Sequence, residues 1–174
     1  MTITLDHWNP GFLPNQPYVN GEGGDLTAAG QLQMLAIRNQ PNYDTDTGQV
    51  VGRTLPVDWV DIHDPDPRDA DNPAAVFEQG WEGGGARFSR LEGCWYDEGS
   101  ICVVATSGGD ASQGQVWQYR PAGPDTGELT LVFESPSRSV LSKPDTVCVS
   151  PRGGIILCED GDNDPQYVRG LTPD

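Results

Sequence analysis

The sequence predicts an all-β fold that forms part of a β-propeller, with one short helix in an insertion. One observation is a duplicated hairpin: a shift of 53 residues places Glu92 on Asp145 and the apolar strand 101–105 on 154–158 without a gap. A second observation is that two further apolar strands lie between the copies, so that a four-stranded antiparallel unit recurs about every 50 residues. Propellers repeat such a unit about 4 to 8 times around a channel, so we expect about two blades of a larger protein.

The first part of the chain, residues 1–86, is expected to hold the outer half of one blade, together with loops and the helix. Residues 31–37 and 50–62 alternate apolar and polar side chains, which is typical of half-buried strands. The helix is predicted at 73–83, because a proline suits its first turn, apolar side chains recur on one face and a run of glycines ends it.

Two features of this first part are predicted to be solvated loop residues. The segment 63–73 is dense in Asp and Pro, as calcium loops are, but it lacks the EF-hand order of acids, central Gly and distal Glu. His7 stands in a loop, where a lone histidine is usually solvated rather than catalytic.

Residues 87–140 are expected to form one complete blade, and residues 141–174 the inner part of the next. The hairpin turns are predicted at 97–100 and 150–153, where Gly and Pro tolerate turn angles. The strands of the complete blade are predicted at 93–96, 100–105, 115–120 and 128–133.

Acidic side chains gather at one end of both hairpins. With each turn centred on its middle pair, Glu92 faces Ala105 and Asp145 faces Cys158. In an antiparallel hairpin the first strand begins where the second ends, and we call this shared edge the rim. The acids expected at the rim are Glu92, Asp145, Glu159 and Asp160.

The crowded acids of the rim predict a bound cation. Like charges a few ångströms apart cost about 4 kcal/mol per pair at an effective dielectric of about 20. Oxygen ligands favour a hard ion such as Ca²⁺. The alternative, that each acid is a solvated residue at a strand end, stays open at this point.

The chain carries a formal net charge of -16, with 26 acidic against 10 basic residues. This charge repels polyanions and anionic lipid, so we expect no nucleic-acid partner and no membrane surface. Residues 1–30 lack the basic start and apolar core of a signal peptide, and no apolar run reaches the length of a spanning helix.

The four cysteines show no C-x-x-C spacing of a zinc site. Their predicted partners across the hairpins are Val103 for Cys94, Trp95 for Cys102, Ile155 for Cys148 and Asp145 for Cys158. No cysteine therefore faces another within a hairpin, and buried free thiols are expected.

Six short segments carry a resemblance to a known family. They are ARFSRLEG (86–93), TSGGD (106–110), GQVW (114–117), LVFES (131–135), VSPRGG (149–154) and CEDG (158–161). Together they resemble the PhoX-type alkaline phosphatases, a bacterial family that shares the domain DUF839. The resemblance is dense from residue 84 onward and weaker before it.

The resemblance implies a six-bladed propeller that binds phosphate and hydrolyses phosphomonoesters with a cluster of Fe³⁺ and Ca²⁺ ions. Glu92 is similar to a metal ligand of the family, and Arg90 to its phosphate-contacting arginine, a role that suits the planar guanidinium fork. The remaining rim acids match the family less closely, and Thr146 stands where the family usually has asparagine.

Two hypotheses follow for the function. In the first, the chain is a segment of a metal-dependent phosphomonoesterase, in which metal generates the nucleophile and Arg90 stabilises charge. The resemblance implies further metal ligands and a twin-arginine signal for export to the periplasm or beyond, and neither is found in the chain. We therefore expect it to be inactive alone. In the second, it is a non-catalytic propeller module that binds calcium or a protein.

A propeller segment of this kind is also expected to expose unpaired strand edges. The strands near Leu32 and Val57 are predicted to lack their inner partners, and only 166–171 is predicted to cover the hairpin that ends at Asp160. Exposed edges recruit other strands, so the missing blades or a second copy of the chain are the predicted partners.

Overall fold

The computed structural model describes residues 10–14, 29–68, 72, 74–123, 125–162 and 164–172, so His7 lies outside the described residues. The strands are β1 (Pro10–Pro14), β2 (Gly30–Ile37), β3 (Thr54–Asp61), β4 (Leu91–Asp97), β5 (Ser100–Ala105), β6 (Gln115–Pro121), β7 (Thr126–Glu134), β8 (Pro144–Val149), β9 (Ile155–Glu159) and β10 (Val168–Leu171). One helix, α1 (Ala75–Glu82), is described between β3 and β4.

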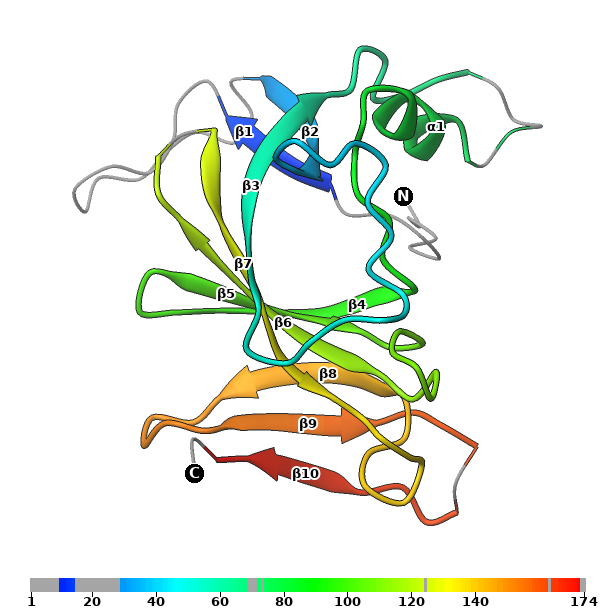
Figure 1. Cartoon of the computed structure of the whole chain (residues 1–174), viewed down its shortest axis with the longest axis vertical. Helices are drawn as coiled ribbons and strands as arrows, with labels where there is room; N and C mark the ends of the chain where they lie inside the picture. The colour runs from blue at the N-terminus through cyan, green and yellow to red at the C-terminus, as the bar shows by residue number, and fades with distance from the viewer. Residues whose placement is uncertain are drawn as a thin grey trace.

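These strands form two antiparallel sheets (Figure 1). The larger sheet has the order β1-β2-β3-β7-β6-β5-β4, and the smaller one has the order β10-β9-β8. The run from β4 to β7 is the predicted four-stranded meander, and β5 occupies the predicted residues. The predicted fold class, an all-β part of a β-propeller with one short helix, is confirmed.

The hairpin of β2 and β3 is joined to this meander, a pairing that was not predicted from the sequence. Residues 54–58 of β3 pair with 126–130 of β7, while 57–61 of the same strand pair with 33–37 of β2. The long strand β3 thus links both units into one curled sheet (Figure 1). The expectation that strands near Leu32 and Val57 lack partners was wrong, because Leu32 pairs with Phe12 and Val57 with both neighbours.

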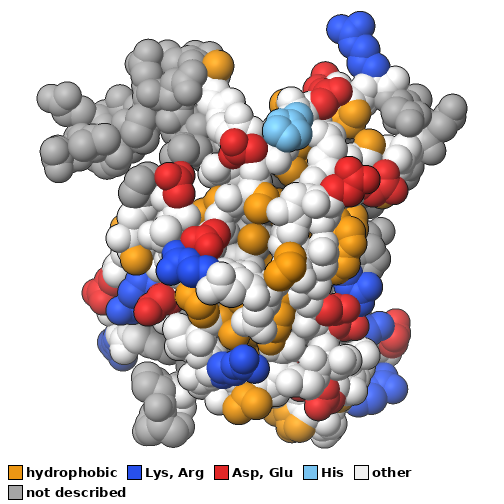
Figure 2. All heavy atoms as spheres, turned by 45° about the horizontal axis from the view of Figure 1, so that its top comes forward, with side chains coloured by type: hydrophobic (Ala, Val, Ile, Leu, Met, Phe, Trp, Pro, Cys, Tyr) orange, Lys and Arg blue, Asp and Glu red, His pale blue; other side chains and the backbone are white. Residues whose placement is uncertain are grey.

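Two hydrophobic cores lie on the two faces of the meander. The first lies inside the curl of the larger sheet, where the rings of Phe88 and Trp117 pack edge to face at an interplanar angle of 88°. A cavity of about 160 Å³ lined by apolar and aromatic side chains lies in this core. Figure 2 shows hydrophobic side chains over the middle of one face of the molecule, with acidic side chains spread around them. The second core lies between the meander and the smaller sheet, and includes Cys102, Val104, Val147 and Leu157.

The two hairpins have turns of different length. In the first, Asp97 pairs with Ser100 around Glu98 and Gly99, whose φ angles of 44° and 79° are those of a two-residue hairpin turn. This is the predicted turn, and it gives the predicted pairing of Cys94 with Val103.

The second turn is one residue longer than predicted. Val149 pairs with Ile155, so the loop covers 150–154. As a result Cys148 faces Ile156 and Cys158 faces Thr146, which corrects the predicted register by one residue. The first strands of the two hairpins are therefore related by 53 residues, but the second strands are related by 54.

The helix α1 lies within the predicted range 73–83 and packs on the larger sheet through Gly80. A side chain at Gly80 would collide with Met34 and Ile62, so only glycine permits this close approach. In the preceding loop, Asp64 is held by hydrogen bonds in both directions with the Gln79 amide. Among the described residues, no helix is long and apolar enough to cross a bilayer.

All four cysteines are free, as predicted. The expectation that they are buried holds for Cys102, whereas Cys94 and Cys158 are exposed and Cys148 is half-buried. The reason is that Cys158 and Cys148 lie on the outer face of the smaller sheet, opposite the face that forms the second core.

Candidate functional site

Both hairpins carry a β-bulge where their first strand begins. In β4 the pairing shifts between Leu91 and Cys94, which leaves Glu92 at the bulge. In β8 the pairing shifts in the same way around Asp145. Bulges redirect side chains and are common beside functional sites. The structure therefore places Glu92 and Asp145 at equivalent positions, as the sequence repeat predicts.

Neither acid faces its predicted partner. Ala105 pairs with Leu91 and not with Glu92, because the bulge adds a residue to β4. Cys158 pairs with Thr146 and not with Asp145, because the longer turn shifts the register on the turn side of the bulge in β8.

Gly93 brings the two bulges into contact. A Cβ atom at this position would lie 2.7 Å from the carbonyl oxygen of Asp145 and 2.8 Å from the backbone nitrogen of Val147. Such distances are too short for any side chain, so the backbones of β4 and β8 touch here. The rim acids Glu92 and Asp145 thus belong to strands that pack directly on each other.

Arg90 stands immediately before β4 in an unusual backbone conformation. Its φ angle is 56°, which is rare for a long side chain and costs conformational free energy. The guanidinium Nη2 lies 3.1 Å from Oε1 of Glu92, and the two side chains are 36% and 30% exposed. The structure therefore holds the predicted phosphate-contacting arginine beside the predicted metal ligand, and leaves both accessible to a solute.

Thr106 ties the two copies together at the rim. Its side chain is fully buried. The backbone nitrogen of Thr106 donates to the carbonyl of Arg90 at 2.8 Å, and its hydroxyl donates to the carbonyl of Pro144 at 2.7 Å. One residue thus fixes the backbone before Glu92 and the backbone before Asp145.

Glu159 lies in a separate network inside the protein. Its side chain is fully buried beside Arg169, whose Nε donates to Oε1 at 2.9 Å. The backbone nitrogens of Ser142 and Tyr167 donate to Oε1 at 3.1 Å and Oε2 at 3.0 Å. Burial opposes ionisation of Glu159, but these hydrogen bonds and the charge of Arg169 outweigh it, so the pKa lies below its usual value. Both oxygens of this predicted ligand already accept protein hydrogen bonds.

The other two acids of the rim are accessible. Asp160 is exposed, and Asp145 is half-buried, with its Oδ2 3.4 Å from the hydroxyl of Thr146. Within the part of the chain that the structure describes, no three His, Cys, Asp or Glu side chains come together as a metal site. The rim thus brings Arg90 to Glu92 and the backbone of Asp145 to Gly93, but it does not gather all four predicted acids.

The glycine-rich loop after β5, residues 106–114, uses its first backbone amides for hydrogen bonds within the protein. The backbone nitrogens of Ser107, Gly108 and Gly109 donate to carbonyls of Ser89, Ala105 and Asp46. The next amide, that of Asp110, donates to Glu134. This loop therefore stabilises the fold around the rim and offers no free amide of these four residues to an anion.

Thr106 and Arg169 are the rim residues that sequence reasoning missed. Thr106 lies inside a segment that carries the family resemblance, but a single threonine gives no signal of the two carbonyls it joins. Arg169 lies 10 residues after Glu159 across the turn between β9 and β10, and only the pairing of these strands reveals the contact.

The fold and this rim define a class of protein: an all-β propeller segment with carboxylates at bulges where two strands begin, and an arginine immediately before one of these strands. Within that class, the chain belongs to the alkaline phosphatase PhoX family, because the sequence model of that family matches residues 11–174. A search of curated proteins returned no significant match.

Among solved structures, the fold is similar to that of Pseudomonas fluorescens PhoX in complex with vanadate, a transition state analogue. The TM-score is 0.62 at 13% sequence identity, and the similarity covers 97% of this chain. It covers 38% of the Pseudomonas chain, so this chain spans well under half of that protein.

Proposed function

We propose that this chain forms one part of a metal-dependent phosphomonoester hydrolase of the PhoX type. Family membership over residues 11–174 is the observation that carries the proposal. The Pseudomonas structure supports the substrate class, because vanadate is described there as a transition state analogue.

Arg90 is the residue we propose to contact the phosphate. Its guanidinium is partly exposed and is oriented by Glu92 at 3.1 Å. A guanidinium presents paired N–H donors that match two phosphate oxygens. Donors fixed in advance near developing negative charge lower the barrier of such a reaction.

Glu92 and Asp145 are the carboxylates we propose as metal ligands, with exposed Asp160 as a further candidate. The resemblance proposes Ca²⁺ and Fe³⁺ as the ions. The described residues do not complete a site for either ion, because they contain no cluster of three potential ligands. Glu159 fits least, since Arg169 and two backbone amides occupy its oxygens. We therefore propose that the isolated chain is inactive and that other blades supply the remaining ligands.

Release of p-nitrophenol from p-nitrophenyl phosphate tests this proposal. We expect no release by the isolated chain with Ca²⁺ and Fe³⁺, and Ca²⁺-dependent release by a longer polypeptide that contains this chain within a complete propeller. There, Glu92→Gln abolishes release, and Arg90→Gln lowers kcat by about 10²- to 10³-fold. Glu98→Gln, an exposed acid in the turn of the same hairpin, serves as the matched control and leaves kcat unchanged.

A non-catalytic module that binds calcium or a protein is the alternative. The occupied oxygens of Glu159 and the incomplete cluster of described ligands favour a protein-binding module, because they weigh against calcium as well as against the catalytic ions. Ca²⁺ binding by the complete propeller with no release of p-nitrophenol would support this alternative and contradict the hydrolase.

A further inference from the structure

The second hairpin carries a basic residue in the place that Arg90 occupies in the first. The shift of 53 residues that relates Glu92 to Asp145 also relates Arg90 to Lys143. Each basic residue stands immediately before its strand and two residues before the acid at the bulge. Lys143 is the only lysine in the sequence.

The backbone around these two residues is duplicated as well. Both have positive φ angles, 56° for Arg90 and 47° for Lys143, although neither is glycine. Both carbonyls accept a hydrogen bond from the residue that follows the second strand: Thr106 donates to Arg90 at 2.8 Å, and Asp160 donates to Lys143 at 3.0 Å. A strained conformation that occurs twice, in the same setting, points to a use for the two side chains.

The two basic residues belong to one place in the molecule. The backbone nitrogen of Thr106 holds the carbonyl of Arg90, and its hydroxyl holds the carbonyl of Pro144, the residue after Lys143. Gly93, three residues after Arg90, packs against Asp145, two residues after Lys143. Both bases therefore lie where β4 and β8 begin, at the rim.

The side chain of Lys143 is available to a ligand. It is 31% exposed, and its Nζ lies 3.5 Å from Oδ2 of Asp162, which is itself 88% exposed. An ion pair this open contributes little free energy, so an incoming anion can replace it. Arg90 is similarly 36% exposed beside Glu92.

We propose that Lys143 is a second phosphate-binding residue, which contacts the same phosphate group as Arg90. This inference rests on the proposed function. Arginine offers a planar pair of donors and lysine a mobile point charge, and phosphate sites use both. In a chain with a net charge of -16, a phosphate needs local positive charge to bind, and the repeated bases supply it at the rim.

The unique lysine allows a direct test on the full chain. Reductive methylation with ¹³C-formaldehyde labels Lys143 and the N-terminal amine and keeps their charge. Inorganic phosphate is then titrated while the Lys143 methyl signal is followed by NMR, with chloride at equal ionic strength as the reference. We expect a saturable shift of that signal with phosphate and none with chloride.

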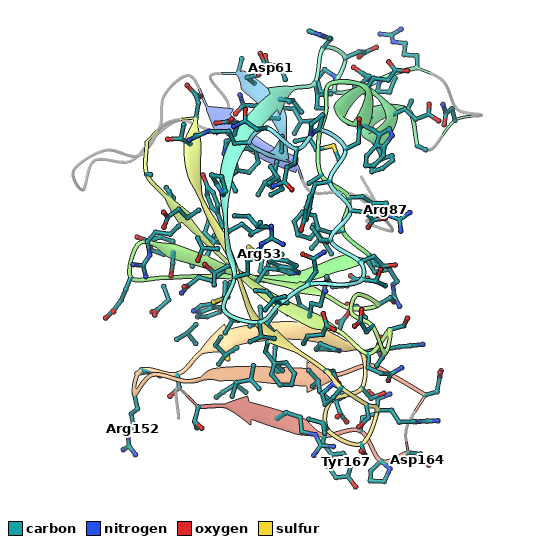
Figure 3. The ribbon with its side chains drawn as sticks, in the orientation of Figure 1. Arg53, Asp61, Arg87, Arg152, Asp164 and Tyr167 are labelled. Carbon is teal, nitrogen blue, oxygen red and sulfur yellow. The ribbon has the colours of Figure 1, made fainter. Side chains whose placement is uncertain are left out.

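Calorimetry with variants gives the second measurement. We expect Lys143→Gln to weaken phosphate binding by about tenfold, as does Arg90→Gln, because each removes one charged hydrogen bond. Lys143→Arg retains binding. Arg152→Gln is the control, because Arg152 lies at the tip of the β8–β9 hairpin, far from the end where Asp164 and Tyr167 lie (Figure 3).

The outcomes separate this inference from the proposed function. If phosphate binds and Arg90→Gln weakens it, while the Lys143 signal stays fixed and Lys143→Gln binds normally, the inference is wrong and the role of Arg90 stands. If Lys143→Gln alone weakens binding, Lys143 binds phosphate without Arg90, so the shared contact and the role of Arg90 are both wrong. An absence of phosphate binding in the unaltered chain contradicts the inference, whereas the role of Arg90 in a complete propeller is decided by the kcat of Arg90→Gln there.

Discussion

At the scale of single residues, Glu159 shows how one acid of the rim is used for stability. Its buried carboxylate is matched by one guanidinium and two backbone amides. A buried carboxylate without partners would cost free energy, and these three hydrogen bonds together offset that cost. The network joins β9, β10 and the segment before β8, which keeps the end of the second hairpin in place beside the rim.

The low pKa of Glu159 predicts a dependence of stability on pH. The pKa in the folded protein lies below the ordinary value of about 4.3, so the stabilisation is complete above that value and is lost as the pH falls below it. We expect Glu159→Gln to lower the free energy of unfolding at pH 7 by about 2 kcal/mol. The difference from the unaltered chain shrinks as the pH falls from about 5 through the lowered pKa of Glu159.

Urea unfolding at a series of pH values measures this difference. Comparison with the unaltered chain is needed, because protonation of the many other acids also reduces charge repulsion as the pH falls. Glu98→Gln, in an exposed turn, is the control and should follow the unaltered chain. A constant difference across the whole range would show that the charge of Glu159 does not contribute.

At the scale of elements, the contact between β4 and β8 depends on Gly93. A methyl group there would overlap the carbonyl of Asp145, which lies 2.7 Å from the position of its Cβ. Backbone atoms cannot swing aside, so Gly93→Ala must separate the strands. We expect it to lower the free energy of unfolding by about 1–3 kcal/mol, the usual cost of overpacking.

Gly170→Ala provides the matched control for this change. Gly170 also lies within a strand, β10, but its added Cβ would meet no atom within 4 Å. Thermal unfolding of both variants therefore distinguishes the close approach from the general effect of replacing a strand glycine. Equal melting temperatures for the two variants would mean that β4 and β8 do not touch as described.

The first hairpin was predictable because its signals are local. A continuous apolar run, Ile101 to Ala105, marks β5, and Glu98 with Gly99 fits a two-residue turn. The strand limits and the pairing near the turn therefore followed from the sequence. The bulge was not predictable, because the strand stays apolar on both sides of the extra residue and no local pattern marks it. The extra residue in the loop 150–154 was not predictable either, and it shifted the register of the second hairpin by one residue.

The candidate site was predictable only at the residues that the sequence repeat relates to each other. The equivalence of Glu92 and Asp145 follows from their spacing and survives the corrected register. The ion pair of Glu159 with Arg169 and the pairing of β3 with β7 join residues from different elements, and no local pattern specifies such contacts. Predicted domain limits at 86 and 140 stay predictions.

At the scale of the whole molecule, the open edges differ from those expected. Among the described strands, β1 and β4 end the larger sheet, and β8 and β10 end the smaller one. Large apolar side chains stand out on two of these edges: Tyr96 on β4 is 70% exposed, and Val168 on β10 is 70% exposed. An edge strand with exposed apolar side chains is a ready partner for another strand.

We expect the isolated chain to associate through these edges, with the net charge of -16 opposing it. Salt screens this repulsion, since the Debye length falls from about 10 Å at 0.1 M to about 3 Å at 1 M. Association should therefore increase with salt, whereas association held by ion pairs would decrease. Light scattering coupled to size-exclusion chromatography measures the mass of the associated species at both salt concentrations.

Variants of the edge strands give a second test. Lysine on an edge strand opposes pairing with another chain, so Tyr96→Lys and Val168→Lys should reduce the mass of the associated species. Val50→Lys, at an exposed residue outside the strands, should not. A monodisperse monomer at both salt concentrations, with cooperative unfolding, would show that the edges are closed to other chains.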